Sequence, residues 1–385
     1  MTTEGKIINS LLWMAHGDAL GFLMENTNSK EIALKDFTYC YNKDLVMEKQ
    51  KGQYSYITEL ILIMIKCLID DASEFKIGVD YQRFYEELKL WKYYRHGNVT
   101  TILERLNNKD YYTSESYWNN TSGSSISRII PILIANKNYH VAEIEAYKNL
   151  LYLNRHPQVL LAGLILLRSG YLLLEKGFIN KKEFIDELKD YLTQLQLKLL
   201  NENLRGRLPK NYNIQFEKER IQFLIDLDRF KNDKRKQNSL WNSREMLLSC
   251  IDFYFTLQSG NPKSLDGIPL LDKKEIMALS YGLWGINSKE AYERKNLVKD
   301  EKSIFNMGQY LYNLRNYQIQ RKNNDKQRES KEMQDIFKLK KDERLQHPIL
   351  NTIRIIEKVE TKDYIKVLVK TKIGTYTFLN YKIRQ

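Results

Sequence analysis

The stretch that decides how this chain is interpreted is Gly52-Gln53-Tyr54-Ser55-Tyr56-Ile57-Thr58-Glu59-Leu60. A short polar segment runs directly into apolar residues at helical spacing, which predicts a turn followed by a buried helix over Thr58–Ala72. Glu59 falls in the first turn of that helix, where the helix dipole favours an anion. The next carboxylates, Asp70 and Asp71, would lie roughly 18 Å further along the helix, too far to share chemistry with its start.

A second informative segment lies upstream, where residues 7–24 carry apolar side chains at helical spacing. Gly17 and Gly21 interrupt the pattern on either side of Asp18, and Glu25 follows at the end. Glycines inside a helix cost stability, so they indicate that another backbone or a ligand comes close. The residues alone leave both alternatives open.

Together, the two segments resemble the signature of the ADP-ribosylglycohydrolase family, which reads Gly-x-Tyr-Ser/Thr-Asp-Asp-Thr at the first stretch. The resemblance implies a mainly α, orthogonal all-α domain with metal ions beside a bound ADP-ribose. In this chain the two aspartates are replaced by Tyr56 and Ile57. Mg²⁺ and Mn²⁺ need oxygen ligands in near-octahedral array, which a phenol and a sec-butyl group cannot supply.

The second metal motif of the family, Gly-Gly-Asp-Thr-Asp-Thr, is also missing. It would precede the small-residue helix at Ala278–Gly285, but only Asp272 stands there as a possible ligand, followed by Lys273 and Lys274. These lysines would bring positive charge to the place of a cation. We therefore predict no cofactor, with Mg²⁺ as the expected ion if the site functioned. The degenerate metal positions are Ser55, Tyr56, Ile57, Thr58 and Asp272.

Two further loops resemble ligand-binding segments of the family. The Ser122–Ser125 turn before Arg128 corresponds to the segment that lines the ADP-ribose pocket, and free N–H groups before a helix can hold phosphate. A serine-capped helix start explains the same turn without a ligand. Asn154 and His156 precede an apolar helix over residues 157–174, where the family has Thr-His-x-x-Pro, and Pro suits the first position of such a helix. Aligned on that proline, the family histidine falls on Asn154.

The resemblance thus assigns the candidate site residues. Asp18 and Glu25 are the catalytic candidates. The ligand-binding candidates are Gly17, Gly21, Ser122, Gly123, Ser124, Ser125, Arg128, Asn154 and His156.

Composition limits the class of protein. The chain has 385 residues, 43% of them hydrophobic, and a net charge of +13. Because the basic residues are scattered among acids, we favour a solvated surface over nucleic-acid binding. Three widely spaced cysteines argue against a disulfide framework and indicate a cytoplasmic protein. The longest apolar run, Val159–Leu167, is too short to cross a membrane.

The C-terminal part differs in pattern from the rest. After an all-α domain over residues 1–300, we expect a charged helical connector over 301–345 and a β-strand appendage over 346–385. Alternating apolar residues predict three strands in this appendage, with a hairpin turn at Lys372-Ile373-Gly374. Because a small meander buries little core alone, it must pack on the main domain, a second chain or a protein partner.

The preferred functional hypothesis is a pseudoenzyme, a non-hydrolytic binder of ADP-ribose, of a related nucleotide or of an ADP-ribosylated partner. Metal catalysis of the family's kind requires the missing ligands. Two alternatives stay open. One is an active ADP-ribosyl hydrolase with a metal-poor site, using Asp18, Glu25 or Glu59 as the general base. The other is a protein-interaction scaffold without a ligand.

Overall fold

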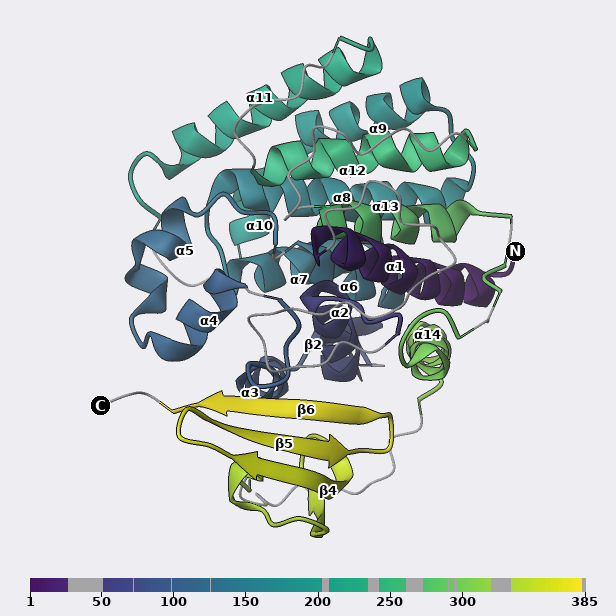
Figure 1. The fold of residues 1–385 in the computed structure, drawn as a ribbon. Helices are drawn as coiled ribbons and strands as arrows, with labels where there is room; N and C mark the ends of the chain where they lie inside the picture. The colour runs from purple at the N-terminus through teal and green to yellow at the C-terminus, as the bar shows by residue number, and fades with distance from the viewer. Residues whose placement is uncertain are drawn as a thin grey trace.

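The computed structural model describes residues 1–26, 51–71, 73–97, 99–124, 126–202, 208–234, 242–260, 273–289, 291–293, 296–319 and 334–382. These residues form a mostly helical body with a small antiparallel sheet at its C-terminal end (Figure 1). The predicted fold class is therefore confirmed. Asp272 and Ser125, two of the sequence candidates, lie outside the described residues.

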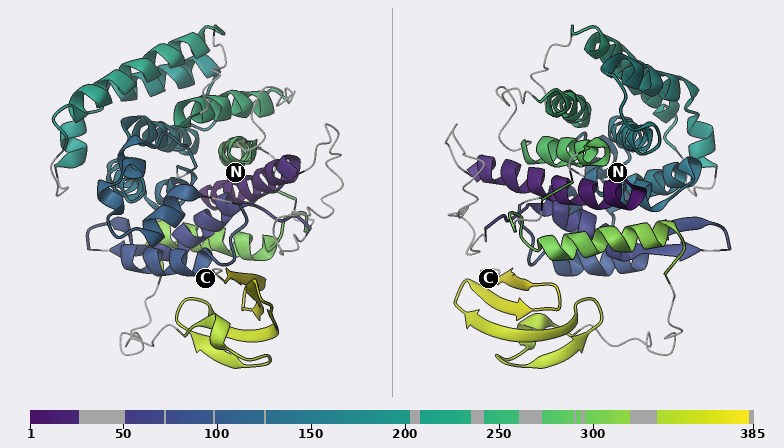
Figure 2. Two further views of the ribbon diagram at one scale, coloured as in Figure 1. Left: turned by 60° about the vertical axis from the view of Figure 1, so that its left-hand side comes forward. Right: turned by 90° about the vertical axis from the view of Figure 1, so that its right-hand side faces the viewer.

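The helical body is built around α8 (Pro157–Lys176), which contacts helices from both halves of the chain. Pro157 starts this helix and His156 caps it, as Pro at the first helical position favours. In the right-hand view of Figure 2, α12 is seen almost end-on while α1 lies lengthwise, so these two helices run in different directions. The other helices of the body are α1 (Thr3–Asn26), α2 (Tyr56–Cys67), α3 (Tyr81–Trp91), α4 (Thr100–Asn107), α5 (Glu115–Asn119), α6 (Ile130–Ala135), α7 (Tyr139–Leu151), α9 (Lys181–Gln194), α10 (Leu197–Asn201), α11 (Tyr212–Lys231), α12 (Ser243–Gln258), α13 (Lys273–Asn287) and α14 (Glu301–Arg315), with 3-10 turns η1 (Tyr111–Thr113) and η2 (Ser127–Ile129).

Two helices of the body, Thr3–Glu25 and Pro157–Lys176, are long and apolar enough to cross a membrane by length and composition alone. Within this fold, however, 83% and 89% of their most apolar windows are buried. Their apolar surface is thus used in the protein core, as in core helices of globular proteins.

The helix that begins at the 52–60 stretch ends earlier than predicted. Helix α2 stops at Cys67, and Leu68–Asp71 forms strand β1, paired antiparallel with β2 (Lys76–Val79). The prediction of a helix to Ala72 was wrong because the apolar residues 68 and 69 suit a buried helix and a strand equally well. Asp70 and Asp71 consequently lie in a hairpin, not at a helix end.

Helix α14 begins the segment predicted as a connector. One face of α14 is buried, with Ile304, Leu311 and Leu314 almost wholly inaccessible, and it packs on α1. A Cβ atom at Gly308 would lie 2.9 Å from Cγ1 of Ile8, which shows how closely the two helices approach. The first part of the charged segment is therefore packed on the helical body.

The C-terminal sheet has four strands in the order β3-β4-β5-β6, all antiparallel. They are β3 (Arg344–His347), β4 (Asn351–Glu360), β5 (Tyr364–Lys370) and β6 (Thr375–Tyr381), preceded by the 3-10 turn η5 (Ile336–Lys338). The three predicted strands correspond to β4, β5 and β6. Strand β3 was missed because four residues carry too short an alternation to be recognised.

The hairpin turn predicted at Lys372-Ile373-Gly374 is confirmed. The backbone N–H of Thr371 donates to the carbonyl of Gly374 at 2.8 Å and closes the turn between β5 and β6.

The sheet packs on the helical body through β6, the strand nearest to it in Figure 1. The N–H of Leu379 donates to the carbonyl of Tyr93 at 2.8 Å. The ring of Tyr94 meets Tyr376 and Phe378 at centroid distances of 5.4 and 5.2 Å. Of the three packing partners expected from the sequence, the main domain is the one seen here.

Candidate functional site at the start of helix α2

The 52–60 stretch is fixed at both ends by the body of the protein. Gly52 has φ +68°, and a Cβ atom there would overlap the carbonyl of Leu297, so glycine is required for two reasons. Ser55 is the N-cap of α2, and its hydroxyl accepts from the N–H of Ile57 at 3.2 Å. The turn predicted before the helix is therefore real, and it places residues 55–58 at the start of α2.

Asp18 of α1 points at this helix start. Its Oδ2 accepts from the backbone N–H of Thr58 at 2.9 Å and from the Thr58 hydroxyl at 2.7 Å. The side chain is fully buried, and burial raises the pKa of Asp18 to about 6, against the lowering effect of hydrogen bonds from Ser55 and Thr58. Asp18 thus ties α1 to α2 as a buried carboxyl group.

Tyr56 and Ile57 are the two residues that replace aspartates in the family resemblance, and both are buried. Ile57 is 0% exposed and belongs to the hydrophobic core. Tyr56 is 2% exposed; its backbone N–H donates to the carbonyl of His96 at 2.8 Å and its hydroxyl donates to Oε1 of Glu275. The phenol is therefore held by a specific partner on α13.

Lys274, the neighbour of Glu275, supplies a positive charge beside this tyrosine. Its Nζ donates to Oε2 of Glu25 at 2.8 Å and lies 5.6 Å from the centroid of the Tyr56 ring. Burial alone would lower the pKa of Lys274, but the carboxylates of Glu275, Glu25 and Asp18 together raise it above its ordinary value. The ammonium group is thus charged and surrounded by acidic groups from α1 and α13.

The residues present do not fit a divalent metal centre. The candidate oxygen ligands are already committed, Asp18 to Thr58, Glu25 to Lys274 and Glu275 to Tyr56. An ammonium group among them repels a second cation. Within the described ranges, no group of three His, Cys, Asp or Glu side chains has metal-binding geometry.

Glu59 has a structural position near the same helix start. Its Oε2 accepts from the indole N–H of Trp91 at 2.7 Å and from the backbone N–H of His96 at 3.2 Å, while Oε1 lies 2.6 Å from Nδ1 of His96. The carboxylate thus anchors the segment after α3, whose His96 carbonyl holds Tyr56 in turn. It faces these partners in a 7% exposed position, and a general-base role for Glu59 finds no support there.

Gly17 and Gly21 lie where α1 and α13 come closest. A Cβ atom at Gly17 would overlap the carbonyl of Met277, and one at Gly21 would overlap the Cα of Lys274. Both glycines sit inside the continuous helix α1, so their N–H groups are not at a helix start. Of the two alternatives left by the sequence, the structure shows the close approach of another backbone.

The Ser122–Ser124 turn uses its polar groups internally. The N–H of Ser122 donates to Oδ1 of Asn120 at 2.7 Å, and the N–H of Ser124 to the hydroxyl of Ser122 at 3.3 Å. Gly123 is buried under α12, where a Cβ atom would lie 2.6 Å from Cε of Met246. The turn leads into η2 and α6, as expected, but two of its N–H groups already have partners.

Arg128 is a core residue. It is 0% exposed, and its guanidinium donates to the carbonyl of Asn149 at 2.6 Å. Burial lowers the pKa of Arg128 to about 10. The side chain therefore points into the protein and joins η2 to α7.

Asn154 and His156 lie beside the serine turn. Nδ2 of Asn154 donates to the carbonyl of Asn120 at 2.8 Å, and its Oδ1 accepts from the N–H of His156 at 2.8 Å. Nδ1 of His156 accepts from the N–H of Gln158 at 3.2 Å and caps α8. Burial and then the charge of Arg244 lower the pKa of His156 to about 4, so it is neutral at pH 7. The structure thus brings these two family-like loops together.

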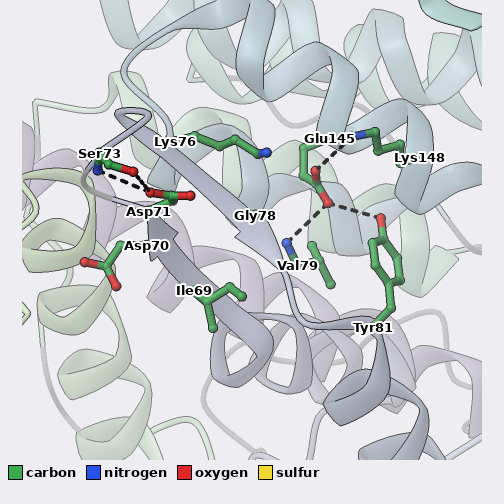
Figure 3. Close-up of a pocket in the computed structure, with 10 residues that line it drawn as sticks. All are labelled: Ile69, Asp70, Asp71, Ser73, Lys76, Gly78, Val79, Tyr81, Glu145 and Lys148. Carbon is green, nitrogen blue, oxygen red and sulfur yellow. Dashed lines mark hydrogen bonds and ion pairs between the residues drawn. The ribbon is translucent and has the colours of Figure 1, made fainter. Parts of the chain in front are cut away.

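Asp70 and Asp71 line a separate pocket of about 680 Å³ between the β1–β2 hairpin and α7 (Figure 3). Oδ1 of Asp71 accepts from the N–H and hydroxyl of Ser73, and Oε1 of Glu145 accepts from the N–H of Val79 and the hydroxyl of Tyr81. These carboxylates hold the hairpin turn and its junction with α7. The pocket is thus separate from the centre at the start of α2.

Sequence reasoning missed Glu275 and His96, which hold Tyr56. Both are far from it along the chain, and neither belongs to a motif. The sequence drew attention to Glu275 only through its neighbours, because it directly follows Lys273 and Lys274.

Comparison with known proteins places the chain in a family. The sequence model of the ADP-ribosylglycohydrolase family matches residues 1–248, about two thirds of the chain. The chain therefore belongs to the ADP-ribosylglycohydrolase family. A solved structure described as an ADP-ribosylglycohydrolase-related protein complex has the same fold, with a TM-score of 0.51 and 13% identity over 81% of this chain and 99% of that one. Among curated proteins, no sequence matches the chain.

Proposed function

We propose that this chain is a non-hydrolytic member of the ADP-ribosylglycohydrolase family, which uses the fold for recognition instead of metal-assisted hydrolysis. The observation that supports the proposal is the arrangement of Tyr56, Lys274, Glu25 and Glu275. A phenol and an ammonium group satisfy the carboxylates that would otherwise be free to hold a metal.

Both charge and lack of space oppose metal binding at the start of α2. Glu25 and Lys274 form an ion pair whose side chains are 18% and 6% exposed, and separating such a pair to admit another cation would leave a buried charge uncompensated. Tyr56 fills the volume at the start of α2 and is 2% exposed. Water activation by a metal needs an open coordination position, which this packing does not offer.

Hydrolysis assays test this proposal. Purified protein is incubated with peptides that carry ADP-ribose on arginine through an N-glycosidic bond or on serine through an O-glycosidic bond. Each reaction is run with and without Mg²⁺ or Mn²⁺, and an active family member is the positive control. We expect no release of ADP-ribose above the uncatalysed rate under any condition. Metal-dependent release by the wild type would overturn the proposal.

A second candidate function is binding of ADP-ribose without cleavage. It is favoured by the direct link between the serine turn and the Asn154 loop, because Asn120 accepts from both Ser122 and Asn154. The family resemblance makes both segments ligand-binding candidates, and the contact between them supports the proposal that part of a ligand pocket is kept. Tyr56 argues against entry of the ribose at the former metal centre.

Calorimetric titration with ADP-ribose distinguishes this candidate from a scaffold without a ligand. Ser124→Glu places a negative charge beside the serine turn, and Ser124→Ala is the matched control because it removes the hydroxyl without adding charge. Binding by the wild type and Ser124→Ala that is lost in Ser124→Glu would support the binder. Absence of saturable binding by the wild type at millimolar ligand leaves the scaffold as the function.

A further inference from the structure

A cavity of about 370 Å³ lies at the junction between the helical body and the C-terminal sheet. One side is formed by α2, α3 and α14, and the other by the turns before β4 and β6 together with Tyr376. Ligand cavities typically have volumes of about 300–1,000 Å³ and are common between domains. This cavity includes residues of the appendage and is distinct from the centre around Tyr56.

The lining of the cavity is basic. Lys66, Arg83 and Lys372 come from three different segments, and none of the described residues that line this cavity is acidic. Lys66 pairs with Glu87, and Nε of Arg83 lies 3.8 Å from Oε1 of the same residue. Glu87 is buried, with its side chain 1% exposed, and its carboxylate interacts with both cations. Three positive charges and one negative charge leave a net charge of +2.

A smaller chamber of about 50 Å³ adjoins the cavity and shares six lining residues with it, among them Lys66, Tyr94 and Tyr376. The chamber also has apolar walls from α2 and α14, including Leu62, Ile63 and Met307. The chamber is also lined by two carboxylates. Glu59 binds His96 and Trp91, and Asp300 lies 3.5 Å from the hydroxyl of Tyr54, which lines the chamber too. The larger cavity therefore has three basic side chains in its lining, and the adjoining chamber adds aromatic and apolar walls together with two carboxylates.

Polar side chains between these two regions complete the set. The lining also includes Ser303 and Asn306 of α14, Asn351 at the start of β4, and Thr371 of the β5–β6 turn. Amides and hydroxyls of this kind donate to and accept from ribose hydroxyls and base edges. Lysine and arginine bind phosphate through charge-assisted hydrogen bonds.

We propose that this junction cavity binds a nucleoside monophosphate, with the phosphate at Lys66, Arg83 and Lys372 and the ring system toward Tyr94 and Tyr376. Because both the helical body and the sheet contribute contacts, the bound ligand stabilises their packing. This inference uses none of the residues on which the proposed function rests.

The test is calorimetric titration of the full chain with AMP, GMP, CMP and UMP, with adenosine, ribose 5-phosphate and inorganic phosphate as separate arms. We expect saturable binding of at least one nucleoside monophosphate and a rise in melting temperature. Phosphate alone and adenosine alone should each bind at least about tenfold more weakly, since each lacks half of the contacts. Equal affinity for inorganic phosphate would show a simple anion site and overturn the proposal.

Matched variants locate the site. Lys372→Glu reverses a charge in the exposed β5–β6 turn, and Lys362→Glu makes the same change in the exposed β4–β5 turn outside the cavity. We expect Lys372→Glu to weaken binding by about tenfold or more and Lys362→Glu to leave it unchanged. Arg83→Gln removes a positive charge on the helical side of the cavity, and we expect it to weaken binding as well. Equal binding by the wild type and Lys372→Glu, or no saturable binding of any monophosphate at millimolar concentration, would refute the inference.

Discussion

Nζ of Lys274 donates to Oε2 of Glu25 at 2.8 Å and thereby joins the start of α13 to the end of α1. The two residues are 249 positions apart in the chain. A cation supplied by the protein itself thus lies beside Tyr56 and Asp18, where the family resemblance implies metal ions. The ammonium group of Lys274 therefore offsets the negative charge of the neighbouring carboxylates.

Removing this internal cation should destabilise the protein. Lys274→Met leaves Glu25 and Glu275 without their positive neighbour, and breaking a buried pair typically costs about 3–5 kcal/mol. We expect a loss of about 2–4 kcal/mol in the free energy of unfolding, measured by guanidinium denaturation at pH 7. Lys273→Met is the matched control, since Lys273 is half-exposed, and it should change stability by less than about 0.5 kcal/mol. Equal effects of the two substitutions would contradict the prediction.

The hydroxyl group of Tyr56 should contribute to the stability of the folded protein in addition to the packing of its ring. Tyr56→Phe keeps the packing but leaves Oε1 of Glu275 without its donor, which costs about 1–3 kcal/mol for a buried group. Tyr381→Phe, at a 51% exposed position, serves as the control and should be nearly neutral. Urea denaturation of both variants measures the difference. An unchanged or increased stability of Tyr56→Phe would show that this hydrogen bond contributes nothing.

Asp18 predicts a specific dependence of stability on pH. Its pKa is about 6 in the folded protein against 3.8 for the ordinary value, so between these pH values the folded state binds the extra proton. Stability from this group therefore falls as pH rises from about 4 to about 6, by up to ~3 kcal/mol, and is constant above that range. Asp18→Asn keeps an acceptor for Thr58 and cannot ionise.

The measurement is the free energy of unfolding of the wild type and Asp18→Asn at several pH values between 4 and 8. The stability of the variant relative to the wild type should increase from about pH 4 to about pH 6 and stay constant from there to pH 8. A difference that stays constant with pH would show that Asp18 titrates normally in the folded protein.

Close packing of α1 against α13 predicts a strong effect at Gly21. Alanine favours a helix by about 1 kcal/mol over glycine, yet its Cβ would overlap the backbone of Lys274. We expect Gly21→Ala to destabilise the protein by about 1–3 kcal/mol because the helices must move apart. At Gly78 the nearest atom to an added Cβ is 3.9 Å away, so Gly78→Ala is the control and should be tolerated. Melting temperatures of both variants decide the matter, and a more stable Gly21→Ala would contradict the packing.

Much of the fold could be predicted from local patterns. The helical spacing of residues 7–24, the proline at 157 and the alternation after 350 each determine an element by themselves. The end of α2 could not be predicted, since Leu68 and Ile69 fit either a helix or a strand and pairing with β2 decides between them.

The candidate site was only partly predictable. The replacement of two aspartates by Tyr56 and Ile57 is visible in the sequence. The partners of Tyr56 are not, because contacts such as Tyr56 to Glu275 join residues 219 positions apart and depend on how α1, α2 and α13 pack. For the same reason the sequence could not decide whether Gly17 and Gly21 approach a ligand or a helix.

Restoring the family aspartates should not restore a metal site. In Tyr56→Asp/Ile57→Asp, the ammonium of Lys274 remains beside the new carboxylates and competes with any divalent ion. We expect no Mg²⁺-dependent rise in melting temperature for this double variant. Adding Lys274→Ala to it removes the competing charge, and metal-dependent stabilisation confined to the triple variant would support the role of Lys274. Strong stabilisation of the double variant would contradict it.

The most direct test of a centre filled by its own side chains is titration of Mn²⁺ into the wild-type protein, followed by electron paramagnetic resonance of the free ion. We predict that the free Mn²⁺ signal rises as in buffer alone, and that neither Mn²⁺ nor a chelator changes the melting temperature. Stoichiometric uptake of one or two Mn²⁺ ions per chain, with stabilisation that the chelator reverses, would contradict it.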